Sequence, residues 1–179
     1  MNGAILSLSK DTYGEIMNHL VRADSMLEEA AFAFAIPDPD RGDKFFRVIA
    51  WEPVGPGDFV YRSEINFELT DETRGRVIKR AHDMSASIVE FHSHTGEHTN
   101  AKFSYSDRSG FAEIVPHVWW RLKGKPYFAV VVTRNNFDGL GWLETANATE
   151  RLDALDVAGE YLTPTGLSPL DLEDYGYTF

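Results

Sequence analysis

The clearest structural signal in the chain is residues 127–133, Tyr-Phe-Ala-Val-Val-Val-Thr, which are almost all β-branched or aromatic. Such a run favours a strand. Residues 135–139 supply Asn and Asp-Gly turn chemistry directly after it, and residues 140–143 begin another strand. A turn between two strand-forming runs predicts a β-hairpin. The chain is therefore expected to fold around a β-sheet.

Further strands and helices alternate along the rest of the chain. Strands are expected where the sequence is continuously apolar or alternating, at residues 30–36, 45–51, 59–69 and 87–94. Helices are expected from Ser9 or Asp11 to about residue 23, from Thr70 to about residue 84, and from a Ser106 cap onward. This alternation predicts an α/β or α+β fold in which helices flank a mixed sheet.

No repeat, linker or composition break divides the chain, so residues 1–179 are expected to form one domain with a core at about 10–145. The segment from about 146 to 179 has no assigned structure. Within it, residues 151–162 fit either a strand or an amphipathic helix. The acidic tail that follows is expected to be loosely held.

Charge and composition restrict the partners. The chain has 17 Lys and Arg residues against 28 Asp and Glu residues, a formal net charge of −11. Such a surface repels nucleic-acid phosphates and anionic membranes, so neither partner is expected. No stretch approaches the roughly 20 apolar residues of a membrane span, and no signal peptide is recognisable. We therefore expect a cytoplasmic protein, and because Cys is absent, any metal must be held by His and carboxylate groups.

A candidate metal site follows the expected strand 87–94. Side chains two positions apart on a strand share a face, so His92 and His94 can present two imidazoles to one ion at about 2 Å from each nitrogen. Asp107 follows in the first turn of the next helix. Three protein ligands with an open fourth position are typical of catalytic zinc. The alternative interpretation is a polar loop with coincident spacing.

A metal-bound water also needs a proton acceptor. Glu29 is the leading candidate, because it stands where a loop enters the apolar strand 30–36. Glu28 points the other way if the strand is already regular, so the choice between them depends on register. Ser104 lies about one helical turn before Asp107 and could donate to a developing oxyanion, cap the helix, or do both. His98 is either a spare ligand or a solvated loop residue.

The order of an upstream Glu, His-x-His and Ser-x-x-Asp resembles the signature of the JAMM (also called JAB or MPN) zinc metalloproteases. The resemblance covers residues 10–145 in layout, but its specific positions are Glu29, His92, His94, Ser104 and Asp107. It implies an MPN-like domain that holds one zinc ion per chain through His92, His94 and Asp107. It also implies that Glu29 takes a proton from the metal-activated water, while Ser104 supports the oxyanion.

The same resemblance implies a substrate: a ubiquitin-like protein or its conjugate, bound by its extended C-terminal tail and cut at a peptide or isopeptide bond. Compact chains of this kind look like the bacterial branch of the family, where a stand-alone domain processes a ubiquitin-like protein or a sulfur-carrier precursor. The alternative function is a non-catalytic MPN-type scaffold or modifier-binding module. Such members usually lose a ligand or the Glu, and this chain retains the whole set.

Two features depart from the family's common pattern. Thr95 stands where many members have Pro, and the segment 95–103 between His94 and Ser104 is longer than usual. An enlarged polar loop is one explanation, since this segment contains Gly96. A register error at Ser104 is the other.

Overall fold

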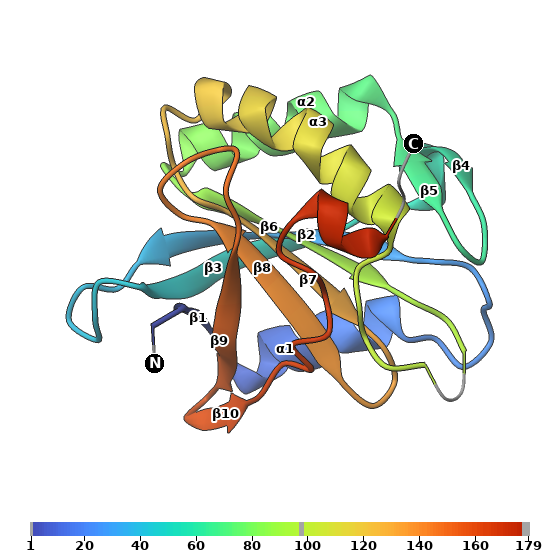
Figure 1. Ribbon diagram of the computed structural model, residues 1–179, viewed down its shortest axis with the longest axis horizontal. Helices are drawn as coiled ribbons and strands as arrows, with labels where there is room; N and C mark the ends of the chain where they lie inside the picture. Colours follow the sequence, from blue (N-terminus) through green and yellow to red (C-terminus); the bar gives the residue numbers. More distant parts are fainter. Residues whose placement is uncertain (1, 97–98, 177–179) are drawn as a thin grey trace.

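A computed structural model describes residues 2–96 and 99–176. Within them, one sheet runs in the strand order β1-β3-β2-β6-β7-β8-β9-β10, and β1 also pairs with β9. That additional pairing closes seven strands into a mixed β-barrel, with β10 attached to β9. Strands β4 and β5 form a separate two-stranded sheet. Helices α2 and α3 lie together on one side of the barrel, and α1 lies on another (Figure 1).

The barrel strands are β1 (Ala4–Leu8), β2 (Ala30–Pro37), β3 (Phe45–Pro53), β6 (Ser87–Ser93), β7 (Tyr127–Val132), β8 (Phe137–Trp142) and β9 (Glu150–Val157). The remaining strands are β4 (Phe59–Arg62), β5 (Phe67–Leu69) and β10 (Glu160–Leu162). The helices are α1 (Lys10–Leu20), α2 (Asp71–Asp83) and α3 (Tyr105–Arg121), with short 3-10 turns η1 (Pro56–Asp58) and η2 (Leu172–Tyr175). None of the helices in the described ranges has the length and apolar character that crossing a membrane requires.

The expectation of an MPN-like mixed sheet flanked by helices is wrong, because the sheet is closed rather than open. The parallel pairing of β1 with β9, which runs from Ala4 opposite Leu152 to Leu8 opposite Val157, joins the two edges that an open sheet would leave free. The residues of β1 were expected only as a short apolar start. Of the two alternatives for residues 151–162, a strand or an amphipathic helix, the strand is confirmed, as β9 and β10. Over residues 2–96 and 99–176, the fold is that of an α+β protein built on a closed barrel with three helices.

One core fills the barrel. Side chains that alternate along each strand of a closed barrel point inward, and all seven barrel strands contribute to one buried cluster that includes Leu6, Phe46, Phe91 and Leu155. Ile16 and Leu20 of α1 belong to the same cluster. Helix α1 therefore packs against the side chains of the barrel core.

A second core lies between the barrel and helices α2 and α3. The outward-facing residues of β2, β6, β7 and β8 meet the apolar faces of both helices there, with Phe34, Ile88, Val77 and Phe111 among the buried members. Strands covered on both faces read as continuous apolar runs. This double burial explains why these strands were predictable from the sequence.

Of the two residues that the sequence offered as caps of α3, Ser106 and Ser104, the structure confirms the second. Ser104, not Ser106, is the N-cap, and its hydroxyl accepts a hydrogen bond from the Asp107 N–H. The caps of the other two helices agree with the expected residues Ser9 and Thr70.

The C-terminal segment is more tightly held than expected. Ser168 is fully buried, and its N–H donates to the buried Asp138 carboxylate at 2.8 Å. Arg108 of α3 donates to the carbonyl groups of Pro169 and Leu170. In Figure 1 this segment, drawn in red, lies against the beginning of α3.

Candidate metal centre

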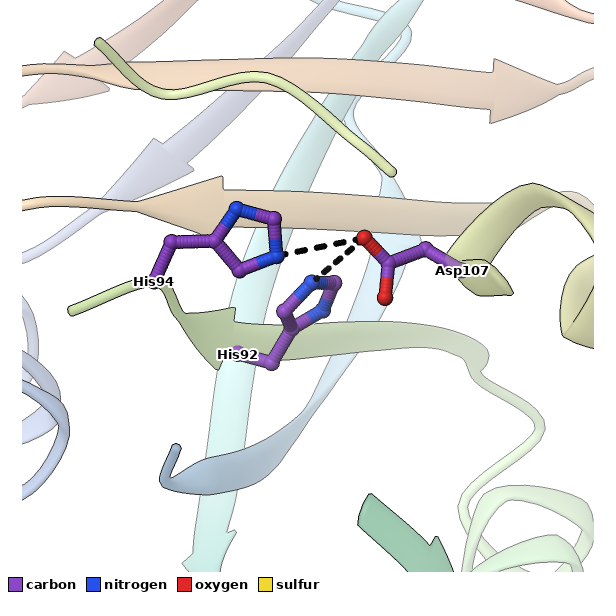
Figure 2. A group of neighbouring side chains, drawn as sticks. All are labelled: His92, His94 and Asp107. Atoms are coloured by element: carbon purple, nitrogen blue, oxygen red, sulfur yellow. Dashed lines mark ion pairs between the residues drawn. The ribbon is translucent and has the colours of Figure 1, made fainter. Parts of the chain in front are cut away.

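His92, His94 and Asp107 converge where β6 ends and α3 begins, and one ligand atom of each lies within 4.8 Å of the others. Both imidazoles face the same Asp107 oxygen (Figure 2). This Oδ2 lies 3.2 Å from Nε2 of His94 and 3.5 Å from Nε2 of His92. Donor atoms around a tetrahedral ion with bonds of about 2.0–2.2 Å are themselves about 3.3–3.6 Å apart. The three side chains therefore lie close enough to share one ion.

Backbone hydrogen bonds fix the two histidines. His92 lies opposite Ala30 of β2, and the His94 N–H donates to the Val132 carbonyl of β7 at 2.9 Å. Ser93, between them, points to the opposite face, where its hydroxyl accepts from the Glu29 N–H at 2.9 Å. Because side chains alternate along β6, the two imidazoles lie on one face, and Ser93 lies on the other, where it connects β6 to the start of β2.

A capping box orients the Asp107 carboxylate. The Ser104 hydroxyl accepts from the Asp107 N–H at 3.1 Å, and Asp107 Oδ2 accepts from the Ser104 N–H at 2.7 Å. Reciprocal bonds of this kind are common at helix starts. Here the capping oxygen is also the oxygen that faces both imidazoles.

His92 supplies the test of whether the site fits a metal ion. The residue is 1% exposed, and neither of its ring nitrogens has a hydrogen-bond partner. The rings of Phe103 and Phe67 surround it, with centroids at 5.5 and 5.8 Å. Buried polar atoms normally have a hydrogen-bond partner. Nε2 of His92 has none and faces the Asp107 carboxylate, an arrangement that fits coordination of a cation between the two groups. Two imidazoles and one carboxylate are a donor set that divalent transition metals accept.

The electrostatics of the cluster favour a positive charge at its centre. Burial by itself would raise the pKa of Asp107, but the two histidines outweigh burial and hold this pKa well below its usual range. Burial would likewise lower the pKa of His92, but Asp107, with Glu28 and Glu90, outweighs that effect and raises it. Asp107 therefore stays ionised, and the carboxylates around His92 favour a positive charge beside its ring.

Glu28, rather than Glu29, lies beside the histidines. The antiparallel register that sets Ala30 opposite His92 brings Glu28 to His94, with Oε1 3.7 Å from Nε2. Glu28 is 2% exposed, and its Oε2 has no hydrogen-bond partner. Burial raises the pKa of the Glu28 carboxyl group, and the opposing effect of the two histidines does not cancel this.

The Glu29 carboxylate, which the sequence analysis preferred as the base, instead pairs with Arg62 of β4 at 2.6 Å. The physical reason is the alternation of side chains at the start of β2, because neighbouring residues point to opposite faces. Arg62 gave no signal in the sequence. Ser104 lies next to Asp107 as the helix cap, and His98 lies outside the described residues.

Two hollows adjoin the centre from different sides. A cavity of 170 Å³ lies against His94, between the end of α1 and Gly96. A smaller one, of 60 Å³, lies against His92 and Asp107 near α3 and β5. One hollow therefore borders His94, and the other borders His92 and Asp107.

Glu90 is a further component of this region that was not among the residues expected from the sequence. It is buried in β6 two positions before His92 and accepts a hydrogen bond from the Tyr127 hydroxyl. A Glu inside an otherwise apolar strand is the signal that could have revealed it, because a buried carboxylate needs a partner.

No known family model matches the chain, and no curated protein matches it. Among solved structures, the fold is similar to the solution structure of protein DSY2949 from Desulfitobacterium hafniense, with a TM-score of 0.55 and 13% sequence identity. The match covers 97% of this chain and 99% of that one. At this level of identity the similarity concerns the fold alone.

Proposed function

We propose that the chain is a zinc-dependent hydrolase that cuts a peptide or isopeptide bond at the C-terminal tail of a ubiquitin-like modifier, as its JAMM-like motif implies. The observation that supports this proposal is the convergence of His92, His94 and Asp107 on one point, with the Glu28 carboxylate 3.7 Å from His94. Three neutral or acidic ligands beside a spare carboxylate are typical of catalytic rather than structural zinc.

The proposed zinc ion is held by His92, His94 and Asp107, one ion per chain. When bound, zinc acts as a Lewis acid and lowers the pKa of water in its coordination sphere to about 7.

Glu28 is the proposed proton carrier, in place of Glu29. Its Oε2 has no hydrogen-bond partner, so this oxygen can accept a proton and return it to the leaving amine. Glu29 has a supporting role, because its N–H and C=O both bond to Ser93 at 2.9 Å. These bonds hold the start of β2 against the end of β6, and so keep Glu28 beside His94.

Ser104 stands at the N-terminus of α3, where the helix dipole favours negative charge. Its oxygen accepts from the Asp107 N–H at 3.1 Å, which leaves its hydroxyl proton for a second partner. A developing oxyanion is the proposed partner.

The extended tail of the modifier needs a binding edge. The small β4–β5 sheet is tied to the centre, since the Glu28 N–H donates to the Ser63 carbonyl at 2.9 Å and the Thr95 hydroxyl donates to the Glu64 carbonyl at 3.2 Å. An extended peptide can add to such an edge through backbone hydrogen bonds. The proposed setting is the cytoplasm, without nucleic-acid or membrane partners.

The test is cleavage of a ubiquitin-like protein that carries a short C-terminal extension. We expect the purified protein to release the extension. Cleavage should stop when 1,10-phenanthroline removes the zinc, and it should recover when zinc is restored. Glu28→Gln should retain zinc and lose cleavage. Cleavage that continues in the chelator would contradict the proposal, as would a zinc-loaded protein that cuts none of a panel of such fusions.

A further inference from the structure

We propose that Tyr175, in the C-terminal segment, is a positioning residue for the metal ligand Asp107 and acts through the one peptide group that joins Phe103 to Ser104. The Tyr175 hydroxyl donates to the Phe103 carbonyl at 2.9 Å. The Ser104 N–H, on the other side of the same peptide group, donates to Asp107 Oδ2 at 2.7 Å. This inference rests on the proposed metal centre but not on any particular substrate.

Peptide geometry makes the connection stiff. The C=O of one residue and the N–H of the next lie in one plane with a fixed relative position. A displacement of the Phe103 carbonyl therefore moves the Ser104 N–H as well. Donation to the carbonyl also polarises the group and strengthens its N–H as a donor. The oxygen at the end of this relay is Asp107 Oδ2, which lies 3.2 and 3.5 Å from the two imidazoles.

Hydrogen bonds hold the C-terminal segment, which carries Tyr175, against Phe103 and the start of α3. The hydroxyl of Ser168, which is fully buried, accepts from the Phe103 N–H at 2.9 Å. Arg108, next to Asp107 on α3, donates to the Pro169 and Leu170 carbonyl groups at 2.7 and 2.6 Å. Phe103 is thus held at both its N–H and its C=O by residues of one distant segment.

The hydroxyl of Tyr175 is suited to a constant donor role. Burial raises its pKa to about 12, so the proton stays on the oxygen near neutral pH. The ring packs edge-on against Tyr105, with centroids 6.0 Å apart. Tyr175→Phe keeps the ring for this contact and removes only the hydrogen bond to Phe103.

The experiment compares the full-length wild type, Tyr175→Phe and the control Tyr161→Phe. The Tyr161 hydroxyl accepts from Arg41 at 2.9 Å on a strand, β10, that carries none of the candidate ligands. Zinc affinity is measured by competition with a chelating dye, the visible spectrum of the cobalt-loaded protein reports ligand geometry, and thermal melting of the metal-free protein reports stability. We expect Tyr175→Phe to weaken zinc binding about tenfold, the size of effect seen when a partner of a metal ligand is removed, and to change the cobalt spectrum. Tyr161→Phe should change neither.

Unchanged zinc affinity and an unchanged cobalt spectrum in Tyr175→Phe would overturn the inference. A loss of melting temperature in this variant without a loss of affinity would overturn it too, because the hydroxyl would then be merely structural. A wild type that binds no zinc would overturn both the metal centre and this inference. A wild type that binds zinc but cuts no fusion, while Tyr175→Phe still weakens binding, would support the inference and contradict the hydrolase alone.

Discussion

Glu28 and His94 face each other across the start of β2 and the end of β6, with Oε1 of the glutamate 3.7 Å from Nε2 of the histidine. The relationship follows from the register that sets Ala30 opposite His92. A shift of one residue would exchange Glu28 with Glu29 and bring the other carboxylate to the centre. The two adjacent glutamates therefore have different environments, and substitutions at them should have different effects.

Glu28→Gln should lower kcat by about 10²–10⁴, the range that a general base contributes, and should leave zinc content unchanged. Glu29→Gln should retain activity within a few fold. It should instead lower the free energy of unfolding by about 3 kcal/mol, because it leaves Arg62 without its buried partner. Steady-state kinetics and urea unfolding measure the two effects. Equal loss of kcat in both variants would contradict the assignment of Glu28.

Zinc should stabilise the protein through the three candidate ligands. A ligand that binds only the folded state at a hundredfold excess over its Kd adds about 2.7 kcal/mol, so the melting temperature of the wild type should rise when zinc is added. His92→Ala and Asp107→Asn should abolish this rise. His117→Ala, on the exposed side of α3, is the matched control and should preserve it. A zinc-dependent rise that survives in His92→Ala would mean that the ion binds elsewhere.

Leu6→Ala should destabilise the barrel where it closes. Leu6 of β1 is fully buried and lies opposite Leu155 of β9. Removing a buried Leu side chain costs about 2–5 kcal/mol. The control Val60→Ala, at a side chain that is 61% exposed, should change the free energy of unfolding by less than about 0.5 kcal/mol. Equal denaturant midpoints for the two variants would argue against closure through β1 and β9.

A strand of this fold could be predicted from the sequence where its own residues indicate a strand, without contacts from distant parts of the chain. The β6 and β7 strands are buried on both faces, so their apolar runs are visible in isolation. Closure depends on β1 meeting β9 from the opposite end of the chain. No local pattern records such a contact, and the short apolar run of residues 4–6 carries little information by itself. The sequence therefore predicted the central strands but an open sheet.

The candidate site was predictable where it depends on short-range spacing. His92 and His94 share a face because they are two apart on a strand, and Asp107 reaches them from the first turn of α3. The choice between Glu28 and Glu29 depended on where β2 becomes regular, which the residues alone left open. Tyr175 and its bond to Phe103 could not be predicted, because they join segments far apart in the sequence.

The ion pair between Arg41 and Asp156 should contribute to stability in a pH-dependent way. Burial alone would raise the pKa of Asp156, but hydrogen bonds from Arg41 and from the Gly159 N–H lower it below its usual value. Because the pKa of Asp156 is lower in the folded state, its ionised form stabilises the fold. This stabilisation is fully present above the pKa of Asp in the unfolded chain, about 3.9. It is lost as the pH falls through the pKa of Asp156 in the folded protein. Asp156→Asn should therefore be less stable than the wild type at pH 7, and the difference should shrink below about pH 4. Urea unfolding of both proteins at pH 7 and below about pH 4 checks this. A difference in unfolding free energy that does not change with pH would contradict it.

Anomalous diffraction at the zinc absorption edge, on crystals of the zinc-loaded protein, tests the metal centre most directly. We predict one peak per chain, about 2.0–2.2 Å from Nε2 of His92, Nε2 of His94 and Oδ2 of Asp107. A protein that binds zinc in solution but shows the peak at other residues, or shows none between these three side chains, would contradict the proposed centre.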